Sequence, residues 1–320
     1  MKKKCLVTGS VGFIFSNFVR KVIHQKEPFT FASIDKISNR TALNSIYLNK
    51  DHEFYIADIT DAHCLDVIFD YEKPNIVIHG AASSHVDASL KDPNEFINNN
   101  ILGTQNIINS CIKHKVDKLI YISTDEIYGH QTSEKEPPFT EEAPLNPRNP
   151  YSASKAAGEL LVKAANQSFG LKYNITRSSN NYGRRQTSDK FIPKVIKCIL
   201  NDEKIPVYGQ GLQMRDWIHV EDNCSAILSI MKNGKNNEIY NISANQELTN
   251  IELVQRICNI MGKGHSLISY VEDRPGHDFR YSIDSSKLKN LGWAPKTNLK
   301  DGLAEVVEWY VLNKNWAFNQ

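Results

Sequence analysis

Two segments of the 320-residue chain carry side chains that could transfer protons. Tyr151 and Lys155 stand four residues apart, so on a helix a phenol and an ammonium group would be neighbours on one face. The positive charge would lower the pKa of the tyrosine and help it act as a base toward a hydroxyl group. The run Thr124-Asp125-Glu126 adds two adjacent carboxylates, which repel each other in a partly dry cleft. One could stay protonated as an acid while the other acts as a base, a division that suits elimination of water.

Each feature also has a plain structural interpretation. A Tyr-x-x-x-Lys pair is frequent by chance and can be a surface lysine beside a tyrosine that packs at a helix start. Adjacent Asp and Glu can form a solvated turn that caps a strand. The position of Thr124 favours catalysis, because it directly follows the strand-like run Leu119 to Ser123. Open α/β sheets bind their ligands at the carboxyl ends of such strands.

A glycine-rich turn follows the first apolar run, Cys5-Leu6-Val7, and opens a helical pattern. Gly9 permits a tight turn and Gly12 permits close approach, so backbone N–H groups could face a pyrophosphate. The third position of the pattern is Phe15, where a glycine normally lets helix and strand pack closely. Asp35 ends a later strand, where a carboxylate can bind ribose hydroxyls and repel a 2′-phosphate. Dinucleotide binding is therefore indicated, with NAD favoured over NADP, and Asp58-Ile59 could contact the adenine.

The elements that must position these residues alternate between strands and helices. Apolar runs at Thr30 to Ile34, Ile76 to Ile78 and Tyr173 to Arg177 are typical of buried strands, and helical patterns cover Phe13 to His24, Pro93 to His114 and Ser152 to Phe169. We predict an α/β fold, a Rossmann-type doubly wound parallel sheet with a smaller C-terminal α+β substrate domain. The predicted NAD-binding domain covers 1–177 and 216–243, and the substrate domain covers 178–215 and 244–320. The stretch Gln131 to Pro150 is predicted to be a surface loop.

Bulk composition excludes several classes of partner. Lys plus Arg (38) nearly balances Asp plus Glu (36), so no global field would attract nucleic acid or an anionic membrane. The six cysteines lack metal-ligand spacing, and no metal site is expected; reduced thiols favour a cytoplasmic location. Lys2 to Lys4 before an apolar stretch imitate a secretory signal, but Thr8, Gly9 and Ser10 interrupt that stretch. No apolar run reaches the ~20 residues of a membrane span.

In these motifs the chain resembles the nucleotide-sugar 4,6-dehydratases of the extended short-chain dehydrogenase/reductase family, the dTDP-glucose type above all. The matching segments run nearly end to end: Ala81 to Asp87, Ser123 to Gly129, Pro150 to Lys155, Ser179 to Gly183, Arg215 to Trp217 and Asp273 to Asp278. Related epimerases usually carry small residues in place of Asp125 and Glu126, so this pair separates the two activities.

The resemblance implies a mechanism. Tyr151 would take the proton from the hydroxyl on carbon 4 of a nucleoside-diphosphate glucose while NAD accepts the hydride. Thr124 would hold that oxygen, and Lys155 would hold the nicotinamide ribose. Glu126 would remove the proton of carbon 5 as Asp125 protonates the departing hydroxyl of carbon 6. The hydride would return to carbon 6, which gives a 4-keto-6-deoxy sugar.

The resemblance also implies binding residues. The cofactor would contact Gly9, Gly12, Phe13, Ile14, Phe15, Asp35, Lys36, Ser38, Asp58, Ile59, Ala81, Ala82, Ser83, Asn99, Ser123, Tyr151, Lys155 and Asn181. The nucleotide sugar would contact Ser84, His85, Thr124, Asn180, Lys190, Phe191, Pro206, Tyr208, Arg215, Asn250, Arg274 and His277. A guanidinium fork can grip two diphosphate oxygens, which suits Arg215 and Arg274.

The chain departs from the family pattern at Phe15, at Ser83 where glutamate is common, and at Arg184-Arg185 where proline and an aromatic residue are usual. Three alternatives stay open: a dehydratase acting on UDP-glucose, a nucleotide-sugar 4-epimerase, and a catalytically silent NAD-binding scaffold. Members of the family are commonly homodimers joined through a helix bundle. The helices at Asn94 to His114 and Ser152 to Phe169 are the candidates.

Overall fold

A computed structural model of the chain describes residues 2–25, 27–37, 52–273 and 276–318. Its main sheet has seven strands, all parallel, in the order β10-β6-β5-β4-β1-β2-β3. The connections change direction between β1 and β4, the switch point at which doubly wound sheets bind ligands. The strands are β1 (Lys3–Thr8), β2 (Phe29–Asp35), β3 (His52–Ile56), β4 (Ile76–His79), β5 (Lys118–Thr124), β6 (Tyr173–Ser178) and β10 (Glu238–Ile242). This confirms the predicted fold class.

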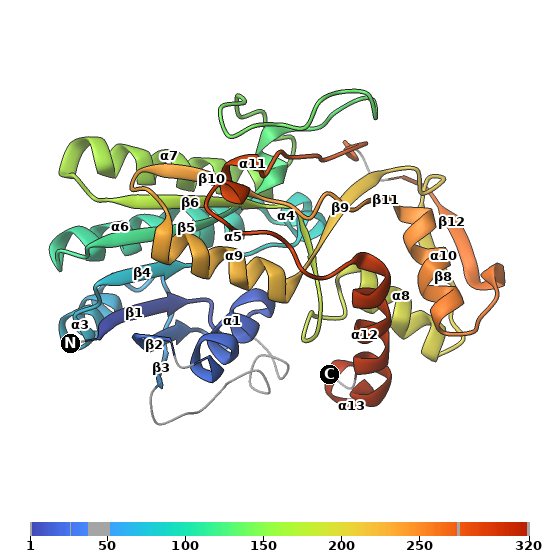
Figure 1. Cartoon of the computed structure of the whole chain (residues 1–320), viewed down its shortest axis with the longest axis horizontal. Helices are drawn as coiled ribbons and strands as arrows, with labels where there is room; N and C mark the ends of the chain where they lie inside the picture. Colours follow the sequence, from blue (N-terminus) through green and yellow to red (C-terminus); the bar gives the residue numbers. More distant parts are fainter. Residues whose placement is uncertain (1, 26, 38–51, 274–275, 319–320) are drawn as a thin grey trace.

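Helices cover both faces of the sheet (Figure 1). One face packs against α1 (Phe13–His24), α9 (Val220–Asn233) and α11 (Ser286–Lys289), and the other against α3 (Ala62–Glu72), α6 (Gly103–Lys113) and α7 (Pro150–Phe169). The strands alternate accordingly, since Cys5 and Val7 belong to the first hydrophobic cluster and Leu6 to the second. Both faces being covered explains why these strands read as continuous apolar runs.

Local signals in the sequence fix the bounds of α7, the helix that carries Tyr151 and Lys155. The Asn149 side chain accepts a hydrogen bond from the Ser152 amide at 2.8 Å, and the Ser152 hydroxyl reaches back to the Asn149 backbone. Pro150 occupies the first turn, where its missing N–H costs nothing. The helix ends at Gly170, whose φ of 71° is easily reached only without a side chain.

The helix predicted from Pro93 to His114 is present, but its middle segment is π-helical. It consists of α5 (Pro93–Phe96), the π-helical segment η1 (Ile97–Leu102) and α6, and α4 (Val86–Lys91) precedes it. The wider π turn places Asn99 and Asn100 side by side in the interior, both buried. Asn100 donates to the Ser83 carbonyl and the Ser154 hydroxyl, so these polar contacts replace regular helix geometry.

A third hydrophobic cluster lies apart from the sheet, on the right of Figure 1, and the elements around it form what we call the second part of the chain. Its strands are β7 (Asn180–Tyr182), β8 (Ile205–Tyr208), β9 (Met214–His219), β11 (Glu247–Thr249) and β12 (Ile268–Val271); its helices are α8 (Phe191–Leu200), α10 (Asn250–Ile260), α12 (Leu299–Leu312) and α13 (Lys314–Phe318), with a short 3-10 turn η3 (His265–Leu267). Near its end the chain returns to the main sheet, because Leu288 and Trp293 belong to the cluster around α1 and α9. The Trp293 indole donates to Ser225 on α9 at 2.8 Å.

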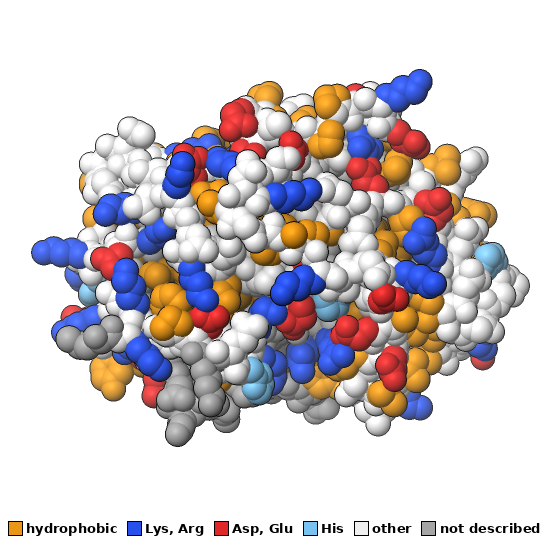
Figure 2. Space-filling model, in the orientation of Figure 1, with side chains coloured by type: hydrophobic (Ala, Val, Ile, Leu, Met, Phe, Trp, Pro, Cys, Tyr) orange, Lys and Arg blue, Asp and Glu red, His pale blue; other side chains and the backbone are white. Residues whose placement is uncertain are grey.

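The loop predicted from Gln131 to Pro150 contains no regular strand, only isolated bridges such as Gln131 with Arg280. Figure 2 shows basic and acidic side chains interspersed over one face, as the near balance of charge suggests. Within the described residues no helix is long and apolar enough to cross a membrane. The same residues contain no cluster of three or more metal-binding side chains.

Candidate active site

The glycine-rich turn joins β1 to α1 and forms one wall of a cavity at the switch point. Gly9 has a φ of +76°, and a Cβ there would lie 2.7 Å from the Ala81 amide nitrogen. A Cβ on Gly12 would lie 3.1 Å from the Gly9 carbonyl oxygen. Backbone thus approaches backbone where a side chain would intrude, and the first N–H groups of α1 remain available to an anion.

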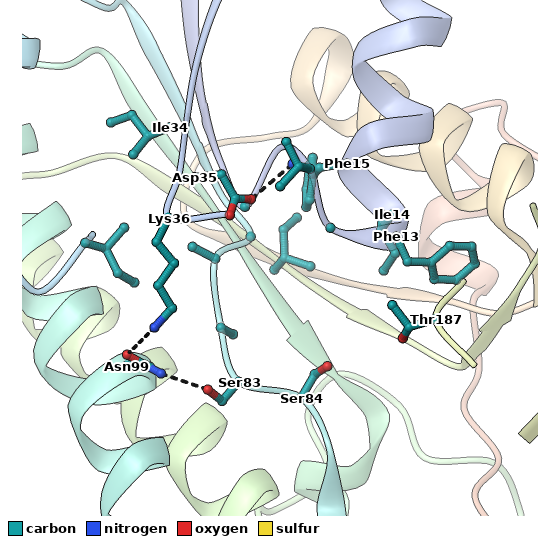
Figure 3. A pocket seen from close by; sticks show the side chains of 18 of the residues that line it. Phe13, Ile14, Phe15, Ile34, Asp35, Lys36, Ser83, Ser84, Asn99 and Thr187 are labelled. Carbon is teal, nitrogen blue, oxygen red and sulfur yellow. Dashed lines mark hydrogen bonds between the residues drawn. The ribbon is translucent and has the colours of Figure 1, made fainter. Parts of the chain in front are cut away.

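Asp35 links the end of β2 to this turn. Its carboxylate accepts hydrogen bonds from the amides of Val11 at 3.0 Å and Ile37 at 3.2 Å. Burial raises the pKa of Asp35, although these backbone amides oppose the rise. Figure 3 shows the carboxylate facing the turn, which is where a ribose would meet it in a dinucleotide site.

A chain of polar contacts runs along the opposite wall (Figure 3). Lys36 donates to the Asn99 amide oxygen at 3.4 Å, and Asn99 donates to the Ser83 hydroxyl at 2.8 Å. The Ser83 hydroxyl in turn donates to Glu95 at 2.7 Å, and Lys36 also lies 3.5 Å from Asp58. Relatives commonly carry a glutamate at the position of Ser83. In this chain the Glu95 carboxylate accepts a hydrogen bond from Ser83, so a carboxylate is still present there.

The cavity measures about 360 Å³. It is lined by these residues named in advance for the cofactor: Gly9, Gly12, Phe13, Ile14, Phe15, Asp35, Lys36, Asp58, Ile59, Ala81, Ala82, Ser83, Asn99, Ser123, Tyr151 and Lys155. Asn181 is not in its lining and instead donates to the Ser179 carbonyl. Ser38 lies outside the described residues.

Thr124 is the last residue of β5, and Asp125 and Glu126 begin the 3-10 turn η2 (Asp125–Tyr128). The Thr124 hydroxyl accepts from the Glu126 amide at 3.3 Å and donates to Asp125 at 3.2 Å. Asp125 is buried, and its Oδ2 has no hydrogen-bond partner. Burial, then the charges of Glu126 and Asp216, raise the pKa of Asp125 well above its ordinary value. Burial therefore favours the protonated form of Asp125.

Glu126 is the more open member of the pair. Its Oε2 accepts from the Asn149 side-chain amide at 3.3 Å, so the residue that caps α7 also orients this carboxylate. The charge of Glu126 raises the pKa values of both Asp125 and Tyr151. These groups therefore converge on one region, where the two neighbouring carboxylates have different environments as the sequence suggested.

Tyr151 corrects one expectation. The pKa of its phenol is raised, first by burial and then by the charge of Glu126, while a hydrogen bond with Thr124 lowers it. Lys155 had been expected to lower this pKa, but the low dielectric and the carboxylate charge dominate. Lys155 is itself buried, and burial lowers its pKa to about 7, opposed by Glu159. Its ammonium lies 4.3 Å from the centre of the Tyr121 ring.

Behind the catalytic face of α7 lies a buried ion pair. Glu159, one turn beyond Lys155, accepts two hydrogen bonds from the Arg177 guanidinium on β6, at 2.6 and 3.0 Å. Arg177 also donates to the Tyr128 hydroxyl at the end of η2. This pair therefore joins the helix that carries Tyr151 to the strand and turn beside the carboxylates, and the sequence offered no periodic signal for it.

Several of the residues named for the nucleotide sugar lie at the junction between the two parts. Lys190 lines the cavity and donates to the Ser84 carbonyl at 3.1 Å. His85 caps α4 and lies 3.6 Å from Asp189, and Phe191 stacks on Trp217.

Arg215, on β9, is buried and close enough to Asp125 to affect its pKa. Its guanidinium donates to the carbonyls of Met214, Phe279 and Asp278 and stacks 4.4 Å from the Tyr281 ring. Among the residues that the structure describes, no carboxylate forms an ion pair with Arg215, and its charge lowers the pKa of Asp125.

The remaining residues named for the sugar nucleotide come from the second part. Tyr208 and His277 form an edge-to-face ring contact at 6.0 Å, and His277 bonds Asp273 at 2.6 Å. Asn180 keeps a buried oxygen without a partner, and the Asn250 amide donates to the Gln213 carbonyl. Pro206 lies in β8, and Arg274 lies outside the described residues.

Some lining residues were not foreseen. Arg185 and Thr187 border the cavity beside Phe13, and Arg185 donates to Asn17 on α1 at 3.1 Å. Arg185 has a φ of 69°, unusual for a residue with a side chain. The departure from the family pattern at this position was the available signal. Gly80, directly after β4, also lines the cavity and was not singled out.

Comparisons with proteins of known sequence and structure indicate the same family that the sequence motifs resemble. The family model described as GDP-mannose 4,6 dehydratase matches residues 6–306. The dTDP-glucose 4,6-dehydratase of Haemophilus influenzae is 40% identical, with 97% of this chain and 98% of that protein covered. The low-salt glycan biosynthesis protein Agl12 of Haloferax volcanii is 40% identical over 96% of this chain and 98% of its own. The solved structure of DesIV, a dTDP-glucose 4,6-dehydratase from Streptomyces venezuelae with NAD and TYD bound, superposes with a TM-score of 0.94 at 36% identity over 99% of both chains.

Proposed function

The chain belongs to the nucleotide-sugar 4,6-dehydratases of the extended short-chain dehydrogenase/reductase family, and we propose that it converts dTDP-glucose to the 4-keto-6-deoxy sugar. One observation carries the proposal. Asp125 and Glu126 are neighbours in sequence, yet the first is buried, with a raised pKa, while the second is less buried and accepts a hydrogen bond from Asn149. An elimination needs one acid and one base on the same substrate, which this pair can supply.

NAD is the cofactor that the residues fit. The turn at Gly9 and Gly12 leaves no room for side chains, and Asp35 presents a carboxylate that a 2′-phosphate would meet with repulsion. The structurally similar DesIV holds NAD. When bound, NAD would take the hydride of carbon 4 and give it back at carbon 6, so that none is consumed.

The protein's own groups then handle the protons. Tyr151 accepts the proton of the hydroxyl on carbon 4. The Thr124 hydroxyl forms a hydrogen bond with the Tyr151 phenol. The ketone that results acidifies carbon 5, and Glu126 removes the proton there. Glu126 gives this proton back to carbon 5 when carbon 6 receives the hydride, and the proton taken up by Tyr151 replaces the one that Asp125 loses. Asp125, whose pKa is raised by burial, gives a proton to the hydroxyl leaving carbon 6. Lys155 lines the cavity and would hold the nicotinamide ribose when NAD is bound. The overall reaction is that of a hydro-lyase.

The nucleotide end of the substrate is assigned to the second part of the chain. We retain the division into 1–177 with 216–243 for the cofactor and 178–215 with 244–320 for the substrate, except that Leu288 and Trp293 pack with the cofactor part. A separate hydrophobic cluster around α8, α10 and α12 supports it. Arg215 and Lys190 supply positive charge at the junction, which a diphosphate in a nearly neutral chain requires.

Homodimerisation and a cytoplasmic location complete the proposal. Four apolar side chains on neighbouring helices are about half exposed: Leu90 on α4, Ile97 and Leu102 on η1, and Leu160 on α7. These segments contact one another, so the side chains can form one apolar surface for a second copy of the chain. All six cysteines are unpaired, which suits a reducing compartment.

Mass spectrometry after incubation with dTDP-, UDP-, GDP- and CDP-glucose tests the function. We expect dTDP-glucose to lose one water, and NMR of the product to show a methyl group at carbon 6 and a ketone at carbon 4. Dehydration of UDP-glucose alone would move the assignment to the other nucleotide. A galactose epimer without loss of mass would indicate a 4-epimerase. Denatured protein that releases no NAD, together with no turnover on any sugar, would favour a silent scaffold.

A further inference from the structure

The third position of the glycine pattern holds Phe15, in the first turn of α1. In this class of site a glycine there lets the helix pack closely on the strand beneath it. Phe15 does not avoid that contact by pointing to solvent, since it is only 3% exposed and belongs to the hydrophobic cluster beneath α1. The space for its ring must therefore come from the opposite surface.

That space is supplied by Gly80, the residue that follows β4. A Cβ on Gly80 would lie 2.1 Å from Cε2, 2.5 Å from Cδ2 and 3.0 Å from Cζ of the Phe15 ring. Distances this short mean that the ring lies directly against the Gly80 backbone. The backbone at Gly80 does not need a positive φ, so the absent side chain, not the conformation, is what the position requires.

The ring has little freedom to yield. Phe15 makes an edge-to-face contact with Phe18 at 5.7 Å, and Phe18, fully buried, makes another with Phe31 on β2. Close-packed interiors transmit such displacements and do not absorb them. A side chain at position 80 would therefore displace α1 as a whole.

Gly80 also touches the turn at the other end of the contact. The missing Cβ of Gly9 would lie 2.9 Å from the Gly80 carbonyl carbon, and the Gly80 amide donates to the Thr8 carbonyl at 3.2 Å. The same short piece of backbone thus supports both the turn and the start of the helix. Phe15 lies beside this turn in Figure 3.

We propose that Gly80 performs the task of the missing third glycine: Phe15 and Gly80 form a matched large and small pair that sets the height of α1, and with it the pyrophosphate-binding turn, above the sheet. The inference about cofactor affinity rests on the proposed NAD-dependent function. The packing of the pair does not depend on it. Phe15 and Gly80 are thus positioning residues for the cofactor.

A double-mutant cycle tests the pair, with Gly80→Ala, Phe15→Ala and the combination of both. We expect Gly80→Ala to weaken NAD binding by about tenfold or more, because overpacking a rigid core shifts backbone. With the ring removed, the same methyl group should be accepted, so the double variant should bind NAD as Phe15→Ala does. Gly264→Ala is the control, because a Cβ there meets no atom within 4 Å.

Two measurements keep the outcomes distinct: the dissociation constant of NAD by calorimetry, and the urea midpoint of the cofactor-free protein. If wild type binds no NAD, the proposed function fails, while non-additive midpoints still support the pair. If Gly80→Ala does not fold, recovery of folding in the double variant supports it, and failure of both overturns it. Wild-type affinity and midpoint in Gly80→Ala would also overturn it, as would strictly additive effects.

Discussion

At the scale of single residues, environment separates groups that the sequence presents as alike. Asp125 and Glu126 are both carboxylates, but only Asp125 is buried beside Thr124 with an oxygen that lacks a partner. Sequence patterns located both residues, together with Tyr151 and Lys155. They could not give the direction in which the pKa of Tyr151 is displaced, because that depends on how much water the folded chain excludes.

The combined change Asp125→Asn and Glu126→Gln should slow water loss by about a hundredfold to ten-thousandfold, because both the acid and the base are removed. Oxidation at carbon 4 should persist and appear as reduced-nicotinamide absorbance. The control is Asp70→Asn with Glu308→Gln, two exposed carboxylates on α3 and α12. Turnover equal to that of the control would contradict the roles given to the pair.

Lys155 should make stability depend on pH. Its pKa falls from an ordinary value of 10.5 to about 7 in the folded protein. The unfolded chain therefore binds more protons between these values, so the free energy of unfolding should rise as pH increases through that window. Below about pH 7 the cost of burying the charge is fully present. Urea unfolding of cofactor-free wild type and Lys155→Met at several pH values measures it, and parallel curves would refute it.

At the scale of elements, the sequence predicted helix bounds best where residues typical of helix starts and ends, such as proline and glycine, were present. The predicted helix from Phe13 to His24 has the observed bounds of α1, and α7 begins at Pro150 and ends before Gly170. The π turn in η1 was missed because Asn99 and Asn100 give no local sign that both are buried. Their partners Ser83 and Ser154 are distant in sequence, and such contacts override periodicity.

Asn149 gives the capping box a second task. Asn149→Ala should lower the free energy of unfolding by about 1 kcal/mol, as loss of an N-cap does. It should also slow elimination, because the Asn149 amide orients Glu126. Asn298→Ala is matched, since Asn298 caps α12 through the Asp301 amide. Steady-state kinetics and urea unfolding of both variants should show equal destabilisation but slower turnover only for Asn149→Ala; equal rates would leave Asn149 a cap alone.

At the scale of the whole molecule, the parallel sheet and its switch point followed from strand and helix alternation, whereas the second part was foreseen only as a region. Its strands are short, and β9 pairs with β7 and β11 from separate stretches of chain. Such pairings leave no period of their own. The position of Arg215 beside Asp125 is likewise a product of long-range folding.

Dimer formation should depend on the apolar surface of α4, η1 and α7. Leu160→Glu places a charge on this surface and should yield a monomer in size-exclusion chromatography with light scattering. Val67→Glu is the matched control, because Val67 on α3 is also 57% exposed. A dimer that survives Leu160→Glu, or that is lost equally in Val67→Glu, would place the interface elsewhere.

Residues in and just after α11 pack against α1 and α9, which limits where the protein can be cut into separate fragments. Leu288 and Trp293 complete the core beneath α1, although α10 before them and α12 after them belong to the other core. A premature stop codon or a protease cut ahead of Ser286 would therefore expose the core beneath α1 as well as the core around α10 and α12. A fragment that contains the core beneath α1, or a chimera that exchanges it between relatives, must therefore include residues 286–293.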